Sequence, residues 1–285
     1  MKKLLFQLDT DAHAAVFDTV VGFDGGADHV IGHGGCTPAN VRPLVEGAIF
    51  TRAPKEKKNT ALFVGGSDMR AGEALLEAIR KVFFADFRVS VMLDSNGSNT
   101  TAAAAVAKLM SSGPVSGRRA VILGGTGPVG RRAAVMLAKE GAQVVLVSRD
   151  VAKASEACRE IKDRFGVVVT PAGAATETDR GRIIEGAEVI LATGAAGAQL
   201  LNEEQWKNSP TLKMLADANA TPPLGLAGVD MMDRGKERHG KICWGAIGFG
   251  TLKLAVHRAC VAKLFERNDL VLDAEEIFAH AKSMA

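Results

Sequence analysis

Short apolar runs alternate with longer stretches of helical periodicity along the whole chain. This alternation predicts an α/β fold, in which helices cover largely parallel β-sheets. In the first third of the chain, strands are expected at residues 4–8, 29–31, 61–64 and 89–93. Helices are expected between and after these strands, at residues 12–21, 38–46, 68–83 and 99–110.

A second series of elements follows the segment Ser111-Ser112-Gly113-Pro114, whose small and helix-breaking residues are typical of a hinge. Its strands are expected at residues 120–123, 144–147, 167–170, 189–192, 214–216 and 242–246. Its helices are expected at residues 131–140, 151–165, 179–185, 252–266 and 274–284. We therefore predict two domains, residues 1–110 and 111–269, with the C-terminal helix within 270–285 packing back on the first.

The segment Gly125-Thr126-Gly127-Pro128-Val129-Gly130 lies between an apolar run and a helical stretch. In that position the first glycine permits a tight turn, the second leaves room for a pyrophosphate, and the third lets the helix pack close to the strand. The helix N-terminus adds N–H groups and the positive end of a dipole. These features predict a Rossmann-type dinucleotide-binding domain, and a glycine-rich turn without a ligand is the alternative.

Three further segments of this domain are expected beside the nucleotide. Thr193, Gly194 and Ala195 follow a strand, and their small side chains permit close approach to the nicotinamide ribose. Asn219 follows the next strand and is expected on the nicotinamide side. A purely structural turn is the alternative at both places. The glycine-rich segment 245–250, which contains Ile247, is expected as a turn near the nucleotide.

The residues after the second strand of this domain indicate which nucleotide binds. NAD-binding domains usually carry a carboxylate there, which accepts hydrogen bonds from the ribose. Here Ser148 stands at that place and Arg149 follows. A hydroxyl and a guanidinium suit a 2′-phosphate, which needs donors and positive charge, so NADP is favoured. Asp150 could offset Arg149 or bind the ribose of NAD, and a solvated Arg149 at a helix start is the alternative.

Composition excludes several classes of protein. The 285 residues carry a net charge of only +3, and the short basic cluster at residues 55–58 reads as a solvated loop, so no nucleic-acid partner is expected. No apolar run reaches the roughly 20 residues that span a bilayer. The four cysteines are scattered, which argues against a disulfide framework and a metal site and fits the cytoplasm.

The residue types that are missing narrow the chemistry. The chain has no tyrosine, which excludes the Tyr/Lys mechanism of short-chain dehydrogenases, and it lacks the ligand spacing of zinc dehydrogenases. None of its six histidines stands in a recognisable pairing with Asp and Arg. This pattern favours a hydride transfer that needs no proton transfer, such as oxidation of an aminal carbon to an amidinium cation.

Several blocks resemble the NAD(P)-dependent methylene-tetrahydromethanopterin dehydrogenases of bacterial one-carbon metabolism. The matching segments are residues 5–11, 23–29, 92–101, 125–130, 217–225, 252–254 and 257–260. The resemblance implies a pterin domain, a Rossmann domain and a cleft between them, as in the related folate dehydrogenase/cyclohydrolases. It also implies a homo-oligomer, and hydride transfer from methylene-tetrahydromethanopterin to NADP⁺ or NAD⁺ in formaldehyde oxidation, with the folate analogue as a further substrate. Members strict for NADP tend to carry Lys where this chain has Asp150, so use of both nucleotides is plausible. Those folate relatives use a tyrosine for hydrolysis, so no cyclohydrolase activity is expected.

The resemblance also directs attention to candidate pterin contacts. The polar block after the fourth strand contains Asp94, Asn96, Thr100 and Thr101, which are expected to face the substrate; a turn that caps the next helix is the compatible local interpretation. Asp9 and Asp11 end the first strand, where a carboxylate could bind the guanidine-like edge of a pterin, or simply form an Asx turn. Lys253 is expected to orient the substrate without carrying a proton.

Two other functions stay open from the residues alone. A shikimate-dehydrogenase-like oxidoreductase would keep the fold, but it needs a Lys/Asp proton pair in the first domain that the sequence does not clearly supply. An NADP-sensing protein without turnover would need no second ligand site, and the polar block at residues 94–101 argues against it.

Overall fold

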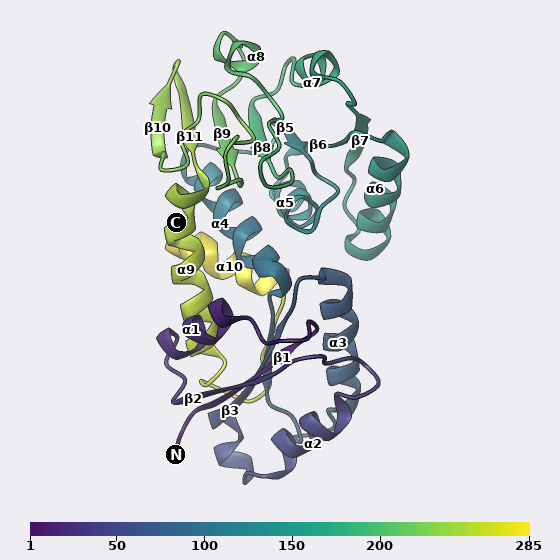
Figure 1. Ribbon diagram of the computed structural model, residues 1–285, viewed down its shortest axis with the longest axis vertical. Coiled ribbons are helices and arrows are strands. Elements are labelled where there is room, and N and C mark those ends of the chain that lie inside the picture. The colour runs from purple at the N-terminus through teal and green to yellow at the C-terminus, as the bar shows by residue number, and fades with distance from the viewer. The chain divides into compact units, whose positions relative to one another are not determined.

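The computed structural model describes residues 1–285 and divides them into two compact units. Unit 1 comprises Met1–Thr100 and Leu254–Met284, and unit 2 comprises Thr101–Lys253, with Ala285. The divisions fall within helices α4 (Ser98–Ser111) and α9 (Ala246–Lys263), which are shown in Figure 1. The segment expected as a hinge, residues 111–114, therefore lies inside unit 2 because α4 continues through the division.

Unit 1 is built on a five-stranded parallel sheet in the order β12-β4-β3-β1-β2. Its strands are β1 (Leu4–Asp9), β2 (His29–His33), β3 (Thr60–Gly65), β4 (Ser90–Leu93) and β12 (Val271–Leu272). Strand β3 is buried at every position, as expected for the centre of a parallel sheet covered on both faces. The carboxyl ends of β1, β3 and β4 lie next to one another because the three strands are parallel neighbours.

The helices of unit 1 follow its strands in the expected alternation. They are α1 (Val16–Asp24), α2 (Arg42–Phe50), the 3₁₀ helix η1 (Pro54–Asn59), α3 (Met69–Val82), the 3₁₀ turn η2 (Ser95–Gly97), the start of α4, the end of α9 and α10 (Ala274–Met284). Helix α3 begins where the Asp68 side chain accepts hydrogen bonds from the N–H groups of Arg70 and Ala71. Helices α1 and α2 begin four residues later than predicted, since no side chain caps them and tertiary packing decides their starts.

Unit 2 contains a seven-stranded sheet in the order β10-β11-β9-β8-β5-β6-β7, parallel except for β10. Its strands are β5 (Arg119–Leu123), β6 (Gln143–Ser148), β7 (Thr170–Gly173), β8 (Val189–Ala192), β9 (Met214–Asp217), β10 (Arg234–Arg238) and β11 (Lys241–Trp244). Its helices include α5 (Pro128–Lys139), α6 (Val151–Phe165), α7 (Glu177–Ile183) and α8 (Glu203–Lys207). Strand order reverses beside β5, which is the switch point where open α/β sheets bind ligands.

Three sequence predictions are wrong in this structure. The strand expected at 167–170 runs from Thr170 to Gly173, and Val168 is 74% exposed. This strand is at the sheet edge, where an apolar run need not enter the sheet. Residues 246–250 of the segment expected as a turn belong to helix α9. Gly245 and Gly248 let the backbone of residues 230–233 pass close by.

The third error concerns Lys57 of the basic cluster at residues 55–58, which was expected as a solvated loop; Lys55 and Lys58 are exposed as expected, but Lys57 is not. The segment forms η1, and the Lys57 side chain is 1% exposed. Its ammonium group donates a hydrogen bond to the carbonyl of Asp86 at 3.0 Å and lies 3.8 Å from the ring centroid of Phe87. An aromatic face and a carbonyl thus replace water around this charge.

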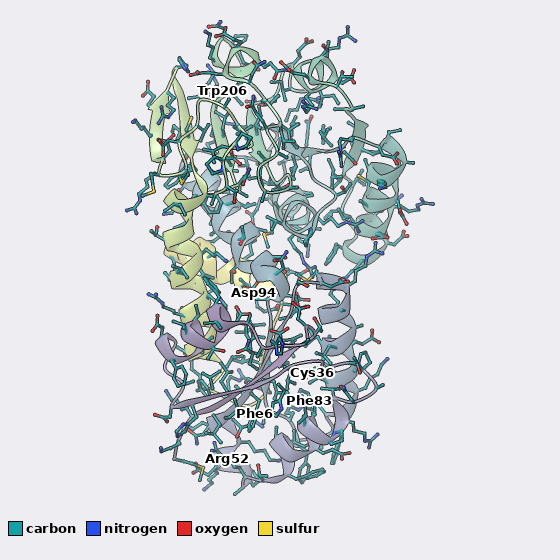
Figure 2. All side chains as sticks on the ribbon, viewed as in Figure 1. Phe6, Cys36, Arg52, Phe83, Asp94 and Trp206 are labelled. Atoms are coloured by element: carbon teal, nitrogen blue, oxygen red, sulfur yellow. The ribbon has the colours of Figure 1, made fainter.

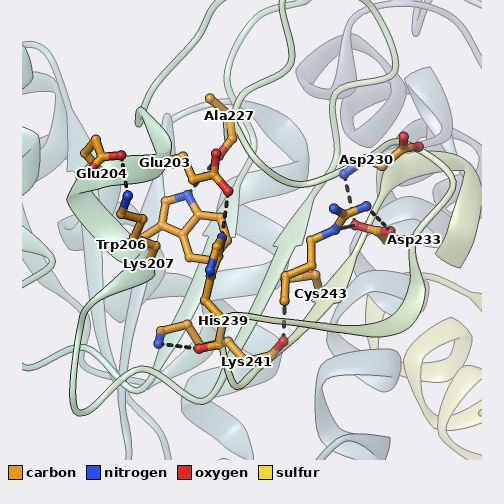
Figure 3. A network of polar contacts seen from close by, with 11 residues as sticks. Glu203, Glu204, Trp206, Lys207, Ala227, Asp230, Asp233, His239, Lys241 and Cys243 are labelled. Carbon is orange, nitrogen blue, oxygen red and sulfur yellow. Dashed lines mark hydrogen bonds and ion pairs between the residues drawn. The ribbon is translucent and has the colours of Figure 1, made fainter.

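Strand β10 was missed, whereas β11 overlaps the strand expected at 242–246, and Figure 3 shows the polar contacts around the hairpin that the two form. Arg238 donates two hydrogen bonds to the carboxylate of Asp233, which is buried. His239 at the tip of the hairpin contacts Glu203, and the indole of Trp206 donates to the carbonyl of Ala227. Charged residues dominate β10, so its sequence lacks the apolar alternation that predicts a strand.

All four cysteines are buried and unpaired. Burial raises the pKa of the Cys243 and Cys260 thiols to about 12. These thiols are therefore protonated at neutral pH and serve as small apolar side chains. Among the helices, none combines the length and the apolar character that crossing a membrane requires.

Candidate functional site

The glycine-rich segment of unit 2 joins strand β5 to helix α5. Gly124 takes the left-handed conformation, with φ of +66°, and turns the chain out of the strand. Gly127 is the N-cap of α5 and Pro128 is its first residue, where a missing N–H group has no cost. The guanidinium of Arg131 donates a hydrogen bond to the carbonyl of Thr126 at 2.9 Å and so fixes the loop to the first turn of α5. The first turn of α5 thus presents its N–H groups at the carboxyl edge of the sheet.

Two of the three motif glycines are required by packing within the protein. A Cβ atom on Gly125 would lie 2.8 Å from Cγ of Leu146, and one on Gly130 would lie 2.6 Å from Cα of Gly125. At Gly127 the nearest atom would be 3.9 Å away, so the fold leaves this position open. A glycine that the fold does not need, at the N-terminus of a helix, fits a ligand whose phosphates approach the backbone.

The neighbouring strand β8 brings its own predicted residues to this loop. The N–H of Thr193 donates to the carbonyl of Leu123 at 2.9 Å. The Thr193 hydroxyl lies 3.2 Å from the same carbonyl oxygen. A Cβ on Gly124 would lie 2.7 Å from Cα of Gly194, so the two loops are in direct contact. The structure thus brings Thr193 and Gly194 together with the glycine-rich segment, and Ala195 is exposed beside them.

The residues expected to choose the nucleotide follow strand β6. Ser148 is half-buried, and Arg149 and Asp150 are exposed. The Asp150 carboxylate caps helix α6, since it accepts a hydrogen bond from the N–H of Ala152 at 2.8 Å. Asp150 therefore caps its own helix, and the exposed guanidinium of Arg149 lies next to it in the chain at this edge.

The loop after β9 is organised by two buried side chains. The carboxylate of Asp217 accepts from the N–H groups of Asn219 at 3.0 Å and Leu226 at 2.8 Å. Burial raises the pKa of Asp217, and these backbone N–H groups oppose that shift. Asn219 in turn accepts from the N–H of Thr221 and donates to the carbonyl of Pro223. Asn219 is 6% exposed, so in this structure its side chain shapes the loop.

In unit 1 the polar block after β4 folds around Asp94, which Figure 2 labels. The Asp94 carboxylate is fully buried and accepts from the N–H groups of Asn99 and Thr100 at 2.9 and 3.0 Å and from the Thr100 hydroxyl at 2.6 Å. It thereby holds the start of α4. Asn96, with φ of +56°, is exposed, and Thr101 is half-buried.

The two carboxylates at the end of β1 differ in burial: one is buried and the other is exposed. Asp9 is fully buried and accepts from the N–H groups of Asp11 and Ala15 at 2.9 and 3.0 Å. Asp11 is exposed and bridges to the next loop by accepting from the N–H and the hydroxyl of Ser67. Asp9 therefore stabilises its own loop, and Asp11 stands at the surface of the carboxyl edge.

One residue of this region was not singled out from the sequence. His257 on α9 is 1% exposed, and its Nδ1 lies 3.8 Å from Oδ2 of Asp94. The only sequence signal was its place in a matched block, 257–260. Lys253 lies one helical turn earlier on α9 and is half-buried.

Comparison with known protein families gives two matches, one in each part of the chain. A family model described as methylene-tetrahydromethanopterin dehydrogenase, N-terminal, matches residues 16–96. An NAD(P)-binding family model matches residues 114–227, which include the glycine-rich segment and β8.

Two proteins of Methylorubrum extorquens are similar over their whole length. One, named bifunctional protein MdtA, is 54% identical over 286 residues, covering 100% of this chain and 99% of that protein. The other, an NAD(P)-dependent methylenetetrahydromethanopterin dehydrogenase, is 32% identical over 294 residues, covering 100% and 99%. Among solved structures, shikimate 5-dehydrogenase from Listeria monocytogenes in complex with shikimate and NAD shares the fold, with a TM-score of 0.57, 10% identity and coverage of 97% and 95%.

Proposed function

Because the chain belongs to the methylene-tetrahydromethanopterin dehydrogenase family, we propose that it transfers a hydride from methylene-tetrahydromethanopterin to NADP⁺. That it is an NAD(P)-dependent oxidoreductase follows from the family and from the dinucleotide-binding domain. The identity of the substrate as a pterin and the preference for NADP⁺ over NAD⁺ are our proposals. The identity of 32% to a dehydrogenase with this substrate, over 100% of the chain, carries the proposal.

The proposed reaction balances without an acid or a base. The methylene carbon between two nitrogens loses a hydride, and the nitrogen lone pairs stabilise the amidinium cation of the methenyl product. When bound, NADP⁺ supplies the acceptor carbon for that hydride and becomes NADPH. No proton is released, so the protein has to bind and orient two rings, which is consistent with a chain that has no tyrosine.

A different set of residues suits each of the two ligands. For the nucleotide, the open position at Gly127 and the N-terminus of α5 would hold the pyrophosphate, with Ser148 and Arg149 toward the 2′-phosphate. Thr193, Gly194, Ala195, Asn219 and Ile247 stay proposed neighbours of the nicotinamide half. For the pterin, we propose that the accessible Asp11, Asn96 and Thr101 make contact, while Asp9, Asp94 and Thr100 hold the loops.

A spectrophotometric assay tests the proposed function. Purified protein is mixed with NADP⁺ or NAD⁺ and with methylene-tetrahydromethanopterin, methylene-tetrahydrofolate or shikimate, and reduced nucleotide is followed. We expect turnover with the methanopterin substrate and NADP⁺. Turnover with shikimate alone would support the shikimate-dehydrogenase alternative, and tight NADP⁺ binding without any turnover would support the sensor.

We also propose that the chain has no cyclohydrolase activity, since it lacks the tyrosine that the resembling folate enzymes use. Incubation of the methenyl product with enzyme in the absence of nucleotide tests this. Loss of the methenyl absorbance faster than in a buffer blank would contradict it. A cytoplasmic homo-oligomer is proposed from the family resemblance, and sedimentation velocity tests the oligomeric state.

Arg149→Ala is expected to raise the KM for NADP⁺ by about 10- to 100-fold, because a charged hydrogen bond to phosphate contributes roughly 1.5–3 kcal/mol. The KM for NAD⁺ should stay unchanged, since NAD⁺ lacks the 2′-phosphate. Arg159→Ala removes an exposed arginine from helix α6 and is the matched control. Equal loss with both nucleotides would refute the assignment of Arg149.

Lys253→Ala is expected to lower kcat/KM for the pterin by about tenfold, the size of one charged hydrogen bond to substrate. The Kd for NADP⁺, measured by titration calorimetry, should not change. Lys263→Ala, in the last turn of the same helix, controls for loss of a positive charge. A kcat/KM equal to that of the wild type would show that Lys253 does not orient the substrate.

A further inference from the structure

Arg131 follows the glycine-rich segment directly and contacts two different parts of unit 2. Its Nε donates a hydrogen bond, 2.9 Å long, to the carbonyl oxygen of Thr126 in the loop between β5 and α5. Its Nη1 forms an ion pair with the carboxylate of Glu160 on helix α6. The Arg131 side chain is 26% exposed, so both contacts are partly shielded from water. One guanidinium therefore connects the loop to α6 as well as to its own helix.

The hydrogen bond to Thr126 sets the orientation of the peptide unit between Thr126 and Gly127. This peptide bond is trans, and in a trans peptide the C=O and the N–H point in opposite directions. Because Arg131 holds the carbonyl oxygen, the N–H of Gly127 points away from the guanidinium. No protein group accepts a hydrogen bond from this N–H.

The N–H of Gly127 stands where the proposed function has the pyrophosphate approach α5. No side chain caps this helix and its first turn contains no acidic residue, so the donors there stay available to an anion. If the peptide unit rotated, it would present its carbonyl oxygen, and that partial negative charge would repel the phosphates. A hydrogen bond that holds the carbonyl on the opposite side therefore pre-organises the loop for its ligand.

Glu160 in turn holds the guanidinium of Arg131. The donors of a guanidinium lie in one plane as a rigid fork, so placing Nη1 on Glu160 also fixes the direction of Nε toward Thr126. Both contacts engage the charge of Arg131 within the protein. A direct contact between Arg131 and a phosphate would require the guanidinium to leave these acceptors.

We propose that Arg131 is a positioning residue for the dinucleotide, which orients the N–H of Gly127 toward the pyrophosphate and is itself held by Glu160. This inference rests on the proposed function, since it takes the assignment of the loop to the pyrophosphate from there. The pyrophosphate is common to NADP⁺ and NAD⁺. Arg131 therefore acts equally on both nucleotides, in contrast to Arg149, which is assigned to the 2′-phosphate.

Titration calorimetry with two nucleotide fragments tests the role of Arg131. ADP-ribose carries the pyrophosphate and lacks the 2′-phosphate, whereas adenosine 2′-monophosphate carries the 2′-phosphate and lacks the pyrophosphate. For Arg131→Ala we expect the Kd values for NADP⁺, NAD⁺ and ADP-ribose to rise by about tenfold each, the size of one charged hydrogen bond. The Kd for adenosine 2′-monophosphate should not change. Arg159→Ala, which removes an exposed arginine of α6, is the matched control and should leave all four constants unchanged.

Glu160→Ala distinguishes positioning from simple attraction by charge. If Arg131 attracted the phosphates by its charge, removal of the neighbouring carboxylate would strengthen binding. We expect the opposite, a Kd for ADP-ribose raised by about three- to tenfold, because the guanidinium is no longer held toward Thr126. The double variant Arg131→Ala/Glu160→Ala should have the same Kd as Arg131→Ala, since Glu160 acts only through Arg131. Glu156→Ala, one helical turn earlier on α6, controls for the loss of a negative charge.

The possible outcomes separate this inference from the proposed function. A wild-type protein that does not bind ADP-ribose would overturn both the assignment of the loop and the inference. Wild-type binding of ADP-ribose with an unchanged Kd in Arg131→Ala would overturn the inference alone, and so would tighter binding by Glu160→Ala.

An equal loss of affinity for adenosine 2′-monophosphate in Arg131→Ala would also overturn the inference, because it would show damage to the whole nucleotide site. Thermal denaturation shows whether each variant is folded. If Arg131→Ala does not fold, the change in Kd for ADP-ribose between Glu160→Ala and its control Glu156→Ala decides the question, and equal constants in the two would overturn the inference.

Discussion

Replacing Gly127 by alanine is expected to weaken NADP⁺ binding by about 10- to 100-fold and to leave the fold intact. The protein atom nearest to the added methyl group would be the carbonyl oxygen of Gly124 at 3.9 Å, an ordinary van der Waals contact, so the methyl group clashes with no protein atom. It would instead occupy the place where phosphates approach the N-terminus of α5. Gly127 has φ of −72° and ψ of 170°, which alanine adopts freely, and the change at the N-cap costs no more than about 1 kcal/mol.

Gly130→Ala is the variant to compare with Gly127→Ala, because its main expected effect is a lower free energy of unfolding. Its methyl group would lie 2.6 Å from Cα and from the carbonyl oxygen of Gly125, and backbone atoms there cannot move aside. We expect a loss of about 2–3 kcal/mol of unfolding free energy. Titration calorimetry and thermal denaturation of both variants test the pair. Wild-type NADP⁺ affinity in Gly127→Ala would contradict the assignment of this loop to the pyrophosphate.

Asp94→Ala is expected to destabilise unit 1 by about 3 kcal/mol. The substitution leaves two backbone N–H groups without their acceptor in a buried place, and leaves the Thr100 hydroxyl only the carbonyl of Gly97 at 3.3 Å. Loss of an N-cap costs roughly 1 kcal/mol, and each buried donor left unsatisfied adds about 1–3 kcal/mol before relaxation. Chemical denaturation of the variant and of the wild type gives the free energy of unfolding of each, and the difference measures the effect.

Asn96→Gly in the same turn separates stability from substrate binding. Glycine accepts the φ of +56° at this position, so the unfolding free energy should stay within about 0.5 kcal/mol of the wild type. If Asn96 contacts the pterin as proposed, the KM for the pterin rises in this variant. For the Asp94→Ala variant, an unfolding free energy equal to that of the wild type would show that Asp94 does not anchor the turn. Asp94 would then again be a candidate substrate contact.

These expectations change the interpretation of the polar residues in unit 1. A carboxylate at the end of a strand satisfies the sequence pattern for a ligand contact whether it faces solvent or its own loop. Asp9 and Asp94 accept backbone N–H groups and are fully buried, whereas Asp11 and Asn96 are exposed. The sequence predicted the place of the polar edge, and the hydrogen bonds distinguish the residues that build it from those that can reach a ligand.

The sequence by itself determined the α/β alternation and the dinucleotide loop, because both depend on residues close together in the chain. A strand, three glycines and a helix start form a local structure whose geometry follows from backbone sterics. The tertiary structure alone decided the burial of Lys57 against Phe87, the close passage of residues 230–233 at Gly245 and Gly248, and the proximity of His257 to Asp94. Periodicity reports that a face is buried, but not what covers it, and those contacts join segments far apart in the chain that only packing brings together.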